Sequence, residues 1–283
     1  MPTGAPDGRQ ELSEETFRAI SQIAHDVAGL HLPAAKRAMV ASRISRRLTR
    51  LALPSFDDYL ALIQQPDAPE RARMVASLTT NVSNFFREAH HFELLRDRVL
   101  PPLLDAARRG QRVRVWSAGC ANGQEAYSIA LTILALDRNA PNFDIRILGT
   151  DIDPSVVRTA QLGSYHTSMV EQIPSDLLGA HFRYDPSSKS FSARSELRSL
   201  ALFRELNLHG PWPMPGRFDV IFCRNVVIYF DEAGQESLWP RFQDKLMDGG
   251  YLFVGHSERI QEDVAPRLKH CAHTVYELSD RAA

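Results

Sequence analysis

Residues 113–130 read VRVWSAGCANGQEAYSIA, and this stretch decides how the chain folds. Its first residues predict a short β-strand, the residues from Ala118 to Gly123 a loop, and the apolar positions that follow a helix. A strand that runs through Gly-x-x-x-Gly into a helix is typical of the first βα turn of a doubly wound sheet, where a nucleotide-like ligand binds beyond the carboxyl end of the strand. Gly119 and Gly123 would let the backbone approach that ligand, because glycine has no Cβ. We therefore expect Gly119 to take part in binding.

The chemistry of this loop narrows the class of ligand. A dinucleotide-binding turn needs Gly-x-Gly-x-x-Gly and a P-loop needs Gly-Lys-Ser/Thr, and neither pattern occurs here. Glu125, in the first turn of the helix, would repel a phosphate but suits a ligand with hydroxyl groups or positive charge. S-adenosylmethionine fits, because it carries ribose hydroxyls, an ammonium group and a sulfonium. A βα turn that binds nothing is the alternative that this loop alone leaves open.

Composition excludes several functional classes. A chain of 283 residues with 44% apolar and 24% charged residues is ordinary for a globular protein of one or two domains. The net charge of −1 predicts no general attraction to nucleic acid or to acidic membranes. Apolar runs stay shorter than the roughly 18 residues of a membrane span. The first ten residues, MPTGAPDGRQ, resemble a disordered lead-in, and three widely spaced cysteines favour reduced thiols in a cytoplasmic protein without a metal site.

Helical signals fill the chain from Ser13 to about Arg109. Ser13 can cap a first helix that ends at Gly29. A second helix is expected from Pro33 to about Leu53, and Ser55 begins a capping box for a third.

The expected second helix carries a basic face. Arg43, Arg46, Arg47 and Arg50 are spaced three or four residues apart, and no acidic residue interrupts the run. The face is either simply solvated or a docking surface for an acidic partner. It lacks the interleaved aromatic residues of a nucleic-acid surface.

The segment 79–92, TTNVSNFFREAHHF, predicts an ordered loop that enters a helix near Glu88. His90 and His91 suggest a metal site. We rejected that interpretation, because adjacent helical residues point about 100° apart and would not converge on one ion.

Polar residues follow two of the expected strands. Asp151 directly follows the expected strand 145–150, at a position where a carboxylate can bind ribose hydroxyls. Asp153 is expected to cap the next helix. Arg224 and Asn225 come directly after the apolar strand 218–223, so they too should lie at the carboxyl edge of the sheet. An arginine in that position must be exposed or paired, and pairing at the mouth of the site is expected.

The pattern changes between Tyr165 and Arg198. Short alternating segments flank a turn at residues 185–189, which predicts a small antiparallel β-insertion. The main sheet resumes with strands at 200–206 and 250–254, and a last strand at 274–278 is expected to close it.

Five segments, in this order and spacing, resemble motifs of the bacterial chemotaxis receptor methyltransferases, the CheR family: TTNVSNFFREAHHF, VWSAGCANGQEAYSIA, GTDID, IFCRNVVIYFD and GYLFVGHSE. The resemblance covers nearly the whole chain. It implies an S-adenosylmethionine-dependent protein-glutamate O-methyltransferase that releases S-adenosylhomocysteine and acts on the cytoplasmic domain of methyl-accepting chemotaxis receptors.

The resemblance also implies an α/β fold, a class I methyltransferase doubly wound sheet with an N-terminal all-helical domain and a small antiparallel β-insertion. The expected boundaries are a lead-in at 1–12, a helical receptor-docking domain at 13–88, and a methyltransferase domain at 89–283 with the insertion at about 165–198.

The resemblance assigns site residues by their positions in the matching motifs. It implies that Arg87 and Tyr229 lie nearest the transferred methyl group. The cofactor contacts implied by the resemblance are Asn81, Ser83, Arg87, Glu125, Asp151, Asn207, Leu208, Arg224 and Asn225.

Three positions depart from the usual family pattern. Ser83 replaces a common threonine, and Gln124 and Ala126 replace Glu and Pro, but the hydroxyl and Glu125 are kept, so cofactor binding is expected to survive. The insertion has Pro-Ser-Ser-Lys-Ser at 186–190 where members that grip a receptor's C-terminal tether peptide carry a Gly-rich loop. This departure argues against tether binding.

Two other functions are alternatives to methylation of receptor glutamates. A class I methyltransferase that acts on a small molecule or nucleic acid would usually carry a motif such as Asn/Asp-Pro-Pro-Tyr where this chain reads Arg-Asn-Val-Val at 224–227. A non-catalytic adaptor would not need Arg87, Glu125, Asp151 and Tyr229, all of which are present.

Overall fold

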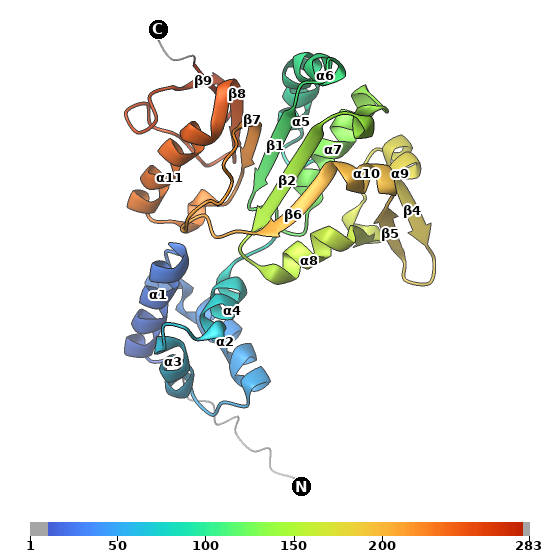
Figure 1. The fold of residues 1–283 in the computed structure, drawn as a ribbon. Coiled ribbons are helices and arrows are strands. Elements are labelled where there is room, and N and C mark those ends of the chain that lie inside the picture. Colours follow the sequence, from blue (N-terminus) through green and yellow to red (C-terminus); the bar gives the residue numbers. More distant parts are fainter. Residues whose placement is uncertain (1–10, 280–283) are drawn as a thin grey trace. The chain divides into compact units, whose positions relative to one another are not determined.

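The computed structural model describes residues 11–279 and divides them into two units (Figure 1). Residues 11–80 and 229–234 form a helical unit, and residues 81–228 and 235–279 form a sheet unit. Residues 1–10 of the expected lead-in lie outside the described residues. Leu12 belongs to the fold, because it is buried and its carbonyl oxygen accepts a hydrogen bond from Arg37 Nε at 2.9 Å.

The helical unit contains α1 (Glu14–Ala28), α2 (Arg37–Leu51), α3 (Phe56–Gln64) and α4 (Pro69–Leu78), with a 3-10 turn η1 (Ala34–Lys36) before α2. The caps predicted for α1 and α3 are confirmed: Ser13 and Ser55 each accept a hydrogen bond from the backbone N–H three residues later. Gly29 ends α1 at a φ of 67°, where glycine avoids the Cβ strain of the left-handed region. Buried apolar side chains from all four helices, such as Ile20, Ile44, Tyr59 and Val75, form the core.

The segment 229–234 belongs to the helical unit although it follows the sheet in sequence. Phe230 forms an isolated antiparallel bridge with Leu30, and the N–H of His31 donates to the carbonyl oxygen of Tyr229 at 2.8 Å. The Tyr229 hydroxyl donates to the carbonyl oxygen of Thr80 at 3.4 Å. Tyr229 therefore makes these contacts within the helical unit.

The sheet unit is built on a seven-stranded sheet in the order β6-β2-β1-β7-β8-β10-β9 (Figure 1). The strands from β6 to β8 pair in parallel, whereas β10 pairs antiparallel with both of its neighbours. This confirms the doubly wound sheet. The strand bounds are β1 Val113–Ala118, β2 Ile145–Asp151, β6 Ala201–Glu205, β7 Phe218–Cys223, β8 Leu246–Val254, β9 Leu268–Ala272 and β10 Val275–Leu278.

The expectation that the strand at 274–278 closes the sheet is wrong. β10 lies between β8 and β9, so β9 forms the edge. Of the five residues of β9, LKHCA, only Leu268 is buried, as is typical of an edge strand that has part of its surface exposed.

Helices cover both faces of the sheet. Val113 and Val115 of β1 point into the core cluster that includes α7 (Gln124–Leu136). Trp116 points to the other face of the sheet, where the centroid of its ring lies 5.4 Å from that of Phe242 in α11 (Glu232–Lys245). Alternate residues of a strand face opposite sides, so α7 and α11 cover opposite faces. The remaining helical segments are α5 Ala89–Leu94, the π-helical η2 Leu95–Val99, α6 Leu100–Arg108, η3 Ala140–Asn142, α8 Pro154–Leu162, α10 Ser195–Leu200 and the 3-10 turn η5 Val227–Tyr229.

The β-insertion is confirmed as a separate three-stranded antiparallel sheet in the order β3-β5-β4. Its predicted turn is closed by Asp185, whose carboxylate accepts hydrogen bonds from the N–H and hydroxyl of Ser187. The bounds are β3 Ser164–His166, η4 Thr167–Met169, α9 Ser175–His181, β4 Phe182–Asp185 and β5 Ser190–Ala193.

Candidate cofactor and active site

The loop after β1 is shaped by its two glycines. Gly119 and Gly123 adopt φ values of 80° and 88°, which residues with a Cβ rarely adopt. A Cβ on Gly119 would clash with the side chain of Val226, and one on Gly123 would lie 2.7 Å from the Cβ of Ala160. The glycines are therefore required for packing within the protein as well as for the approach of a ligand.

Glu125 begins the site at the N-terminus of α7. One carboxylate oxygen accepts a hydrogen bond from the Ser117 hydroxyl at 2.7 Å, and the other lies 3.1 Å from Arg224 Nη1. Burial raises the pKa of the Glu125 carboxyl, and the charge of Arg224 acts in the opposite direction. Glu125 thus lies at the carboxyl end of β1, where the sequence predicted a carboxylate.

Arg224 is buried and paired, as expected for an arginine that directly follows an apolar strand. Its side chain is only 2% exposed and lies between Glu125 and Glu88, with Nη2 at 3.2 Å from Glu88 Oε2. Nη2 also donates to the backbone carbonyl oxygen of Arg87. Arg224 therefore links the end of β7 to the start of α7 and to the 79–92 segment.

Asp151 lies at the carboxyl end of β2, next to the β1 loop. Its carboxylate accepts hydrogen bonds from the backbone N–H groups of Ala121 at 2.8 Å and Asp153 at 3.0 Å. Burial raises the pKa of Asp151, whereas these donors lower it. Asp153 caps α8 through the N–H of Ser155, as predicted, and its second oxygen accepts from the Asn81 amide at 2.8 Å. Asn81 is thereby brought to the same edge of the sheet.

The segment that contains Arg87 has an irregular backbone. Phe86 and Glu88 adopt φ values of 52° and 58°, which are strained for residues with a Cβ. Phe85 is fully buried, and the Arg87 guanidinium donates to the carbonyl oxygen of Val82 at 3.0 Å. Because Arg87 is only partly buried and has further N–H donors, it can bind an anionic group.

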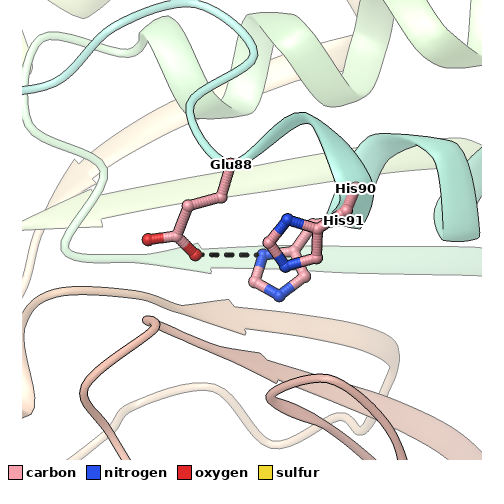
Figure 2. Close-up of side chains that lie close together, drawn as sticks. All are labelled: Glu88, His90 and His91. Carbon is pink, nitrogen blue, oxygen red and sulfur yellow. Dashed lines mark ion pairs between the residues drawn. The ribbon is translucent and has the colours of Figure 1, made fainter.

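Glu88 is a site residue that the sequence reasoning missed. Figure 2 shows its carboxylate directed toward His91, with Oε2 at 3.4 Å from His91 Nδ1, and the same oxygen faces Arg224. The sequence signal for Glu88 was its position directly after Arg87 in the motif TTNVSNFFREAHHF. Its residue type gave no such signal, because glutamate is usually exposed.

The argument that His90 and His91 must point apart is wrong. Their ring centroids are 4.2 Å apart, and possible ligand atoms of Glu88, His90 and His91 all lie within 4.8 Å of one another (Figure 2). The 100° rotation separates the Cα–Cβ directions, but rotation about the side-chain bonds lets the rings approach. The Glu88 carboxylate is, however, already paired with Arg224, whose charge opposes a cation. The absence of a metal stays a prediction.

The other expected cofactor residues lie at or beside the carboxyl ends of the parallel strands. Asn207 follows β6 and accepts a hydrogen bond from the N–H of His209. Leu208 is buried, and Ser83 is half-buried in the loop before Phe85. Asn225 follows β7 at a φ of 58°. Since β6, β2, β1 and β7 are parallel neighbours, their carboxyl ends share one edge, which is where ligands bind in such sheets.

Several buried polar atoms at this edge lack a hydrogen-bond partner within residues 11–279, among them Asn122 Oδ1, Gln124 Oε1, Arg224 Nε and Asn225 Oδ1. Buried polar groups are nearly always hydrogen-bonded, so such orphans indicate a missing ligand or water. Together with the buried carboxylate of Asp151 and the carboxylate of Glu125, whose side chain is 12% exposed, they offer the mixed polar contacts that a ligand with ribose hydroxyls, an ammonium group and a carboxylate requires.

The four arginines of the basic face line one hollow with Ser77 and Thr79, but they are not equivalent. Arg43 donates to the carbonyl oxygens of Ser77 and Thr79. Arg47 is buried in a bidentate ion pair with Glu70, at 2.7 and 2.6 Å, so counting it in an exposed basic face was wrong. Arg46 and Arg50 are exposed. Glu70 comes from α4, so the run of arginines alone could not reveal the pair.

The fold and site define a methyltransferase that binds S-adenosylmethionine. Residues 81–276 match the family described as "CheR methyltransferase, SAM binding domain", and residues 15–79 match "CheR methyltransferase, all-alpha domain". The chain belongs to the CheR methyltransferase family. Its cofactor is S-adenosylmethionine, as the β1 loop and Glu125 predicted.

Proteins named as chemotaxis methyltransferases align with almost the entire chain. A "Probable chemotaxis protein methyltransferase" of Rhizobium etli is 43% identical over 257 residues, which cover 90% of this chain and 96% of that protein. The "Chemotaxis protein methyltransferase" of Escherichia coli is 39% identical over 275 residues, covering 96% and 93%. "Chemotaxis protein methyltransferase 2" of Pseudomonas aeruginosa is 38% identical over 285 residues, covering 98% and 99%. In residues 11–279, none of the helices has the length and apolar character needed to span a membrane.

Proposed function

We propose that this chain transfers a methyl group from S-adenosylmethionine to glutamate side chains of methyl-accepting chemotaxis receptors. The products are glutamate methyl esters and S-adenosylhomocysteine. The observation that carries the proposal is the site edge built from Glu125, Asp151 and Arg224, in a chain whose full-length relatives are named chemotaxis methyltransferases.

The residues that would hold the cofactor divide by chemistry. Asp151 offers a carboxylate for ribose hydroxyls, and Glu125 offers one for a positively charged group. Gly119, Asn81, Ser83, Asn207, Leu208, Arg224 and Asn225 complete the proposed set. When bound, the cofactor supplies a methyl group on a positively charged sulfur.

The acceptor needs no general base. A glutamate with a pKa near 4.3 is already ionised at neutral pH. Its oxygen forms the new bond to the methyl carbon as the bond from carbon to sulfur breaks, so the proposed task of the protein is to orient the carboxylate and remove water from it. We assign the orienting role to Arg87, whose guanidinium has N–H donors beyond the one bound to Val82. The family resemblance adds Tyr229 as a second donor.

Receptor recognition is assigned to the exposed part of the basic face. Arg43, Arg46 and Arg50 would attract acidic segments in the cytoplasmic domain of the receptor. We accordingly propose that the protein acts in the cytoplasm, without insertion into the membrane. The tether peptide is not part of the proposal, because the turn at 185–189 lacks glycine.

The test is incubation with methyl-labelled S-adenosylmethionine and receptor-bearing membranes, followed by measurement of base-labile label on protein. We expect label with the wild type and with Asp176→Ala, an exposed control, and strongly reduced label with Asp151→Ala. Asp151→Ala should also weaken cofactor binding by about 1.5 to 3 kcal/mol through loss of a charged hydrogen-bond partner. Arg87→Ala should lose turnover: unchanged cofactor affinity in this variant supports the role of Arg87 in orienting the carboxylate, whereas lost affinity would assign Arg87 to the cofactor instead. Base-stable label, or none from wild type that binds cofactor, would refute glutamate methylation of these receptors.

A further inference from the structure

The carboxylate of Glu258 is surrounded by backbone N–H groups. Glu258 Oε1 accepts hydrogen bonds from the N–H groups of Val226 and Val227, both at 3.0 Å. Oε2 accepts from the N–H groups of Asn225 at 3.0 Å and Gly255 at 2.6 Å. The turn after β7 thus wraps around one side chain that comes from the loop after β8.

Glu258 is buried at 4% exposure, and no ion pair to it occurs within residues 11–279. Backbone N–H groups that point at one anion form a concave binding site, and charge-assisted hydrogen bonds of this kind are stronger than neutral ones. Burial raises the pKa of this carboxyl, whereas the N–H donors lower it. The backbone N–H donors of the turn therefore take the place of a cationic partner for this buried carboxylate, and the carboxylate in turn fixes the turn.

The conformation of this turn depends on the contact. Asn225 has a φ of 58°, a strained value that persists only where the surroundings hold it. Val226 packs where a Cβ of Gly119 would lie, so the turn also forms part of the wall of the β1 loop. Gly255 leaves the necessary space, because a Cβ there would come within 2.6 Å of Asn225 Nδ2 and 2.9 Å of Glu258 Oε2.

Parallel pairing explains why the two loops meet. Cys223, the last residue of β7, is paired with Val254, the last residue of β8, so the turn after β7 and the loop after β8 start side by side. The polar segment Gly255-His-Ser-Glu258 supplies the anion from that position.

We infer that Glu258 is a positioning residue for the cofactor site, which acts by holding the turn Arg224–Val227 so that Arg224 and Asn225 face the cofactor. The inference rests on the proposed assignment of these two residues as cofactor contacts. Glu258 itself need not touch the cofactor.

The test measures the affinity for S-adenosylhomocysteine by calorimetry at a temperature where every variant is folded. Glu258→Gln keeps the shape but turns an NH2 group toward the backbone donors, so we expect affinity to fall about 10- to 100-fold. Glu262→Gln, the same change at an exposed position in the same loop, should have no effect. In steady-state kinetics, the KM for S-adenosylmethionine should rise in Glu258→Gln while the KM for receptor stays unchanged.

Two further variants separate the possible outcomes. Asn225→Gly keeps the positive φ and removes the amide, so it tests the cofactor contact alone. If Asn225→Gly and Glu258→Gln act through the same contact, their effects will not add. The affinity of the double variant for S-adenosylhomocysteine will then be about that of the single variant with the lower affinity. Weakened binding in Asn225→Gly together with an affinity within twofold of wild type in Glu258→Gln would overturn the inference and leave the proposed function intact. Unchanged affinity in both variants would overturn the assignment of the turn itself.

Gly255→Ala covers the case in which Glu258→Gln does not fold. Its Cβ pushes on Asn225 and on the carboxylate, so weaker binding of S-adenosylhomocysteine is expected without a change of charge. An affinity within twofold of wild type in folded Gly255→Ala would contradict the inference.

Discussion

Each of the two units buries an arginine against glutamate, and the two arginines differ in how completely they are satisfied. In the helical unit, both oxygens of Glu70 bind the Arg47 fork, and the Tyr59 hydroxyl donates to Glu70 Oε1 at 3.0 Å. In the sheet unit, Arg224 lies between two carboxylates, but its buried Nε finds no hydrogen-bond partner in the described part of the chain. The fully paired arginine holds helices together, whereas the incompletely paired one lies at the carboxyl ends of parallel strands, where ligands bind in sheets of this kind.

The largest expected effect comes from breaking the pair of Arg47 and Glu70. Arg47→Met removes the bidentate partner of the buried Glu70 and leaves it Arg73, at 3.8 Å, as an ion-pair partner, so the free energy of unfolding should fall by about 3 kcal/mol. Urea unfolding measures this change. The double variant Arg47→Met with Glu70→Leu should recover most of the loss, because it removes both charges. A double variant as unstable as the single one would contradict a role for the ion pair.

The same arginine change in the sheet unit should affect binding more than folding. Arg224→Lys cannot reach Glu88 and Glu125 with a single ammonium group as the planar fork does. We expect the affinity for S-adenosylhomocysteine to fall about 10- to 100-fold, or about 1.4 to 2.7 kcal/mol. Calorimetry compares this variant with Arg114→Lys, which lies on β1 and pairs with Asp144 away from the carboxyl end. Equal affinities in both variants would remove Arg224 from the site.

His91, beside Glu88, offers a pH test of the sheet unit. Burial lowers the pKa of His91 from 6.5 to about 3. The unfolded chain therefore binds a proton that the folded chain excludes, and stability present above pH 6.5 is lost as the pH falls toward 3, by up to about 1.4 kcal/mol per pH unit. His91→Gln should flatten the pH dependence of urea unfolding between pH 7 and 5, roughly the upper part of this window. His166→Gln, at an exposed position, should keep the wild-type slope, and an identical slope in His91→Gln would show that His91 does not titrate as stated.

The smallest effect is expected on the exposed basic face. Reversal of Arg46 and Arg50 to Glu should raise the KM for receptor about two- to tenfold, since exposed charge pairs contribute little individually. The increase should shrink at high salt, and cofactor affinity should not change. Arg47 is left intact because its loss is expected to destabilise the helical unit. If the double reversal behaves like Arg18→Glu on α1 and leaves receptor KM unaltered, the face is only solvated.

The comparison also shows which parts of the site were accessible from sequence. Asp151 and Arg224 could be placed because each lies at the end of an apolar strand, and Glu125 because it opens the helix that follows the β1 loop. Parallel strands bring their carboxyl ends together at one edge of the sheet. The contacts of Glu70, Glu88 and Glu258 could not be predicted, although the polar loop 255–258 was expected at the carboxyl edge of the sheet, because their main partners are distant in sequence and an isolated glutamate is usually solvated. The error on His90 and His91 has a related cause: helical spacing sets the direction of Cβ, but not the side-chain rotation beyond it.

The doubly wound sheet, the capped N-terminal helices, the β-insertion and the cofactor class could all be predicted from the sequence. These features follow from local periodicity, from turn and cap residues, and from the glycines and glutamate of one loop. Three-dimensional packing was needed to show that β9 lies outside β10, that Arg47 is buried, and that the Glu258 carboxylate binds the turn after β7. Each of these depends on which segments meet in space, and the desolvation of a charge depends on that packing more than on its neighbours in the chain.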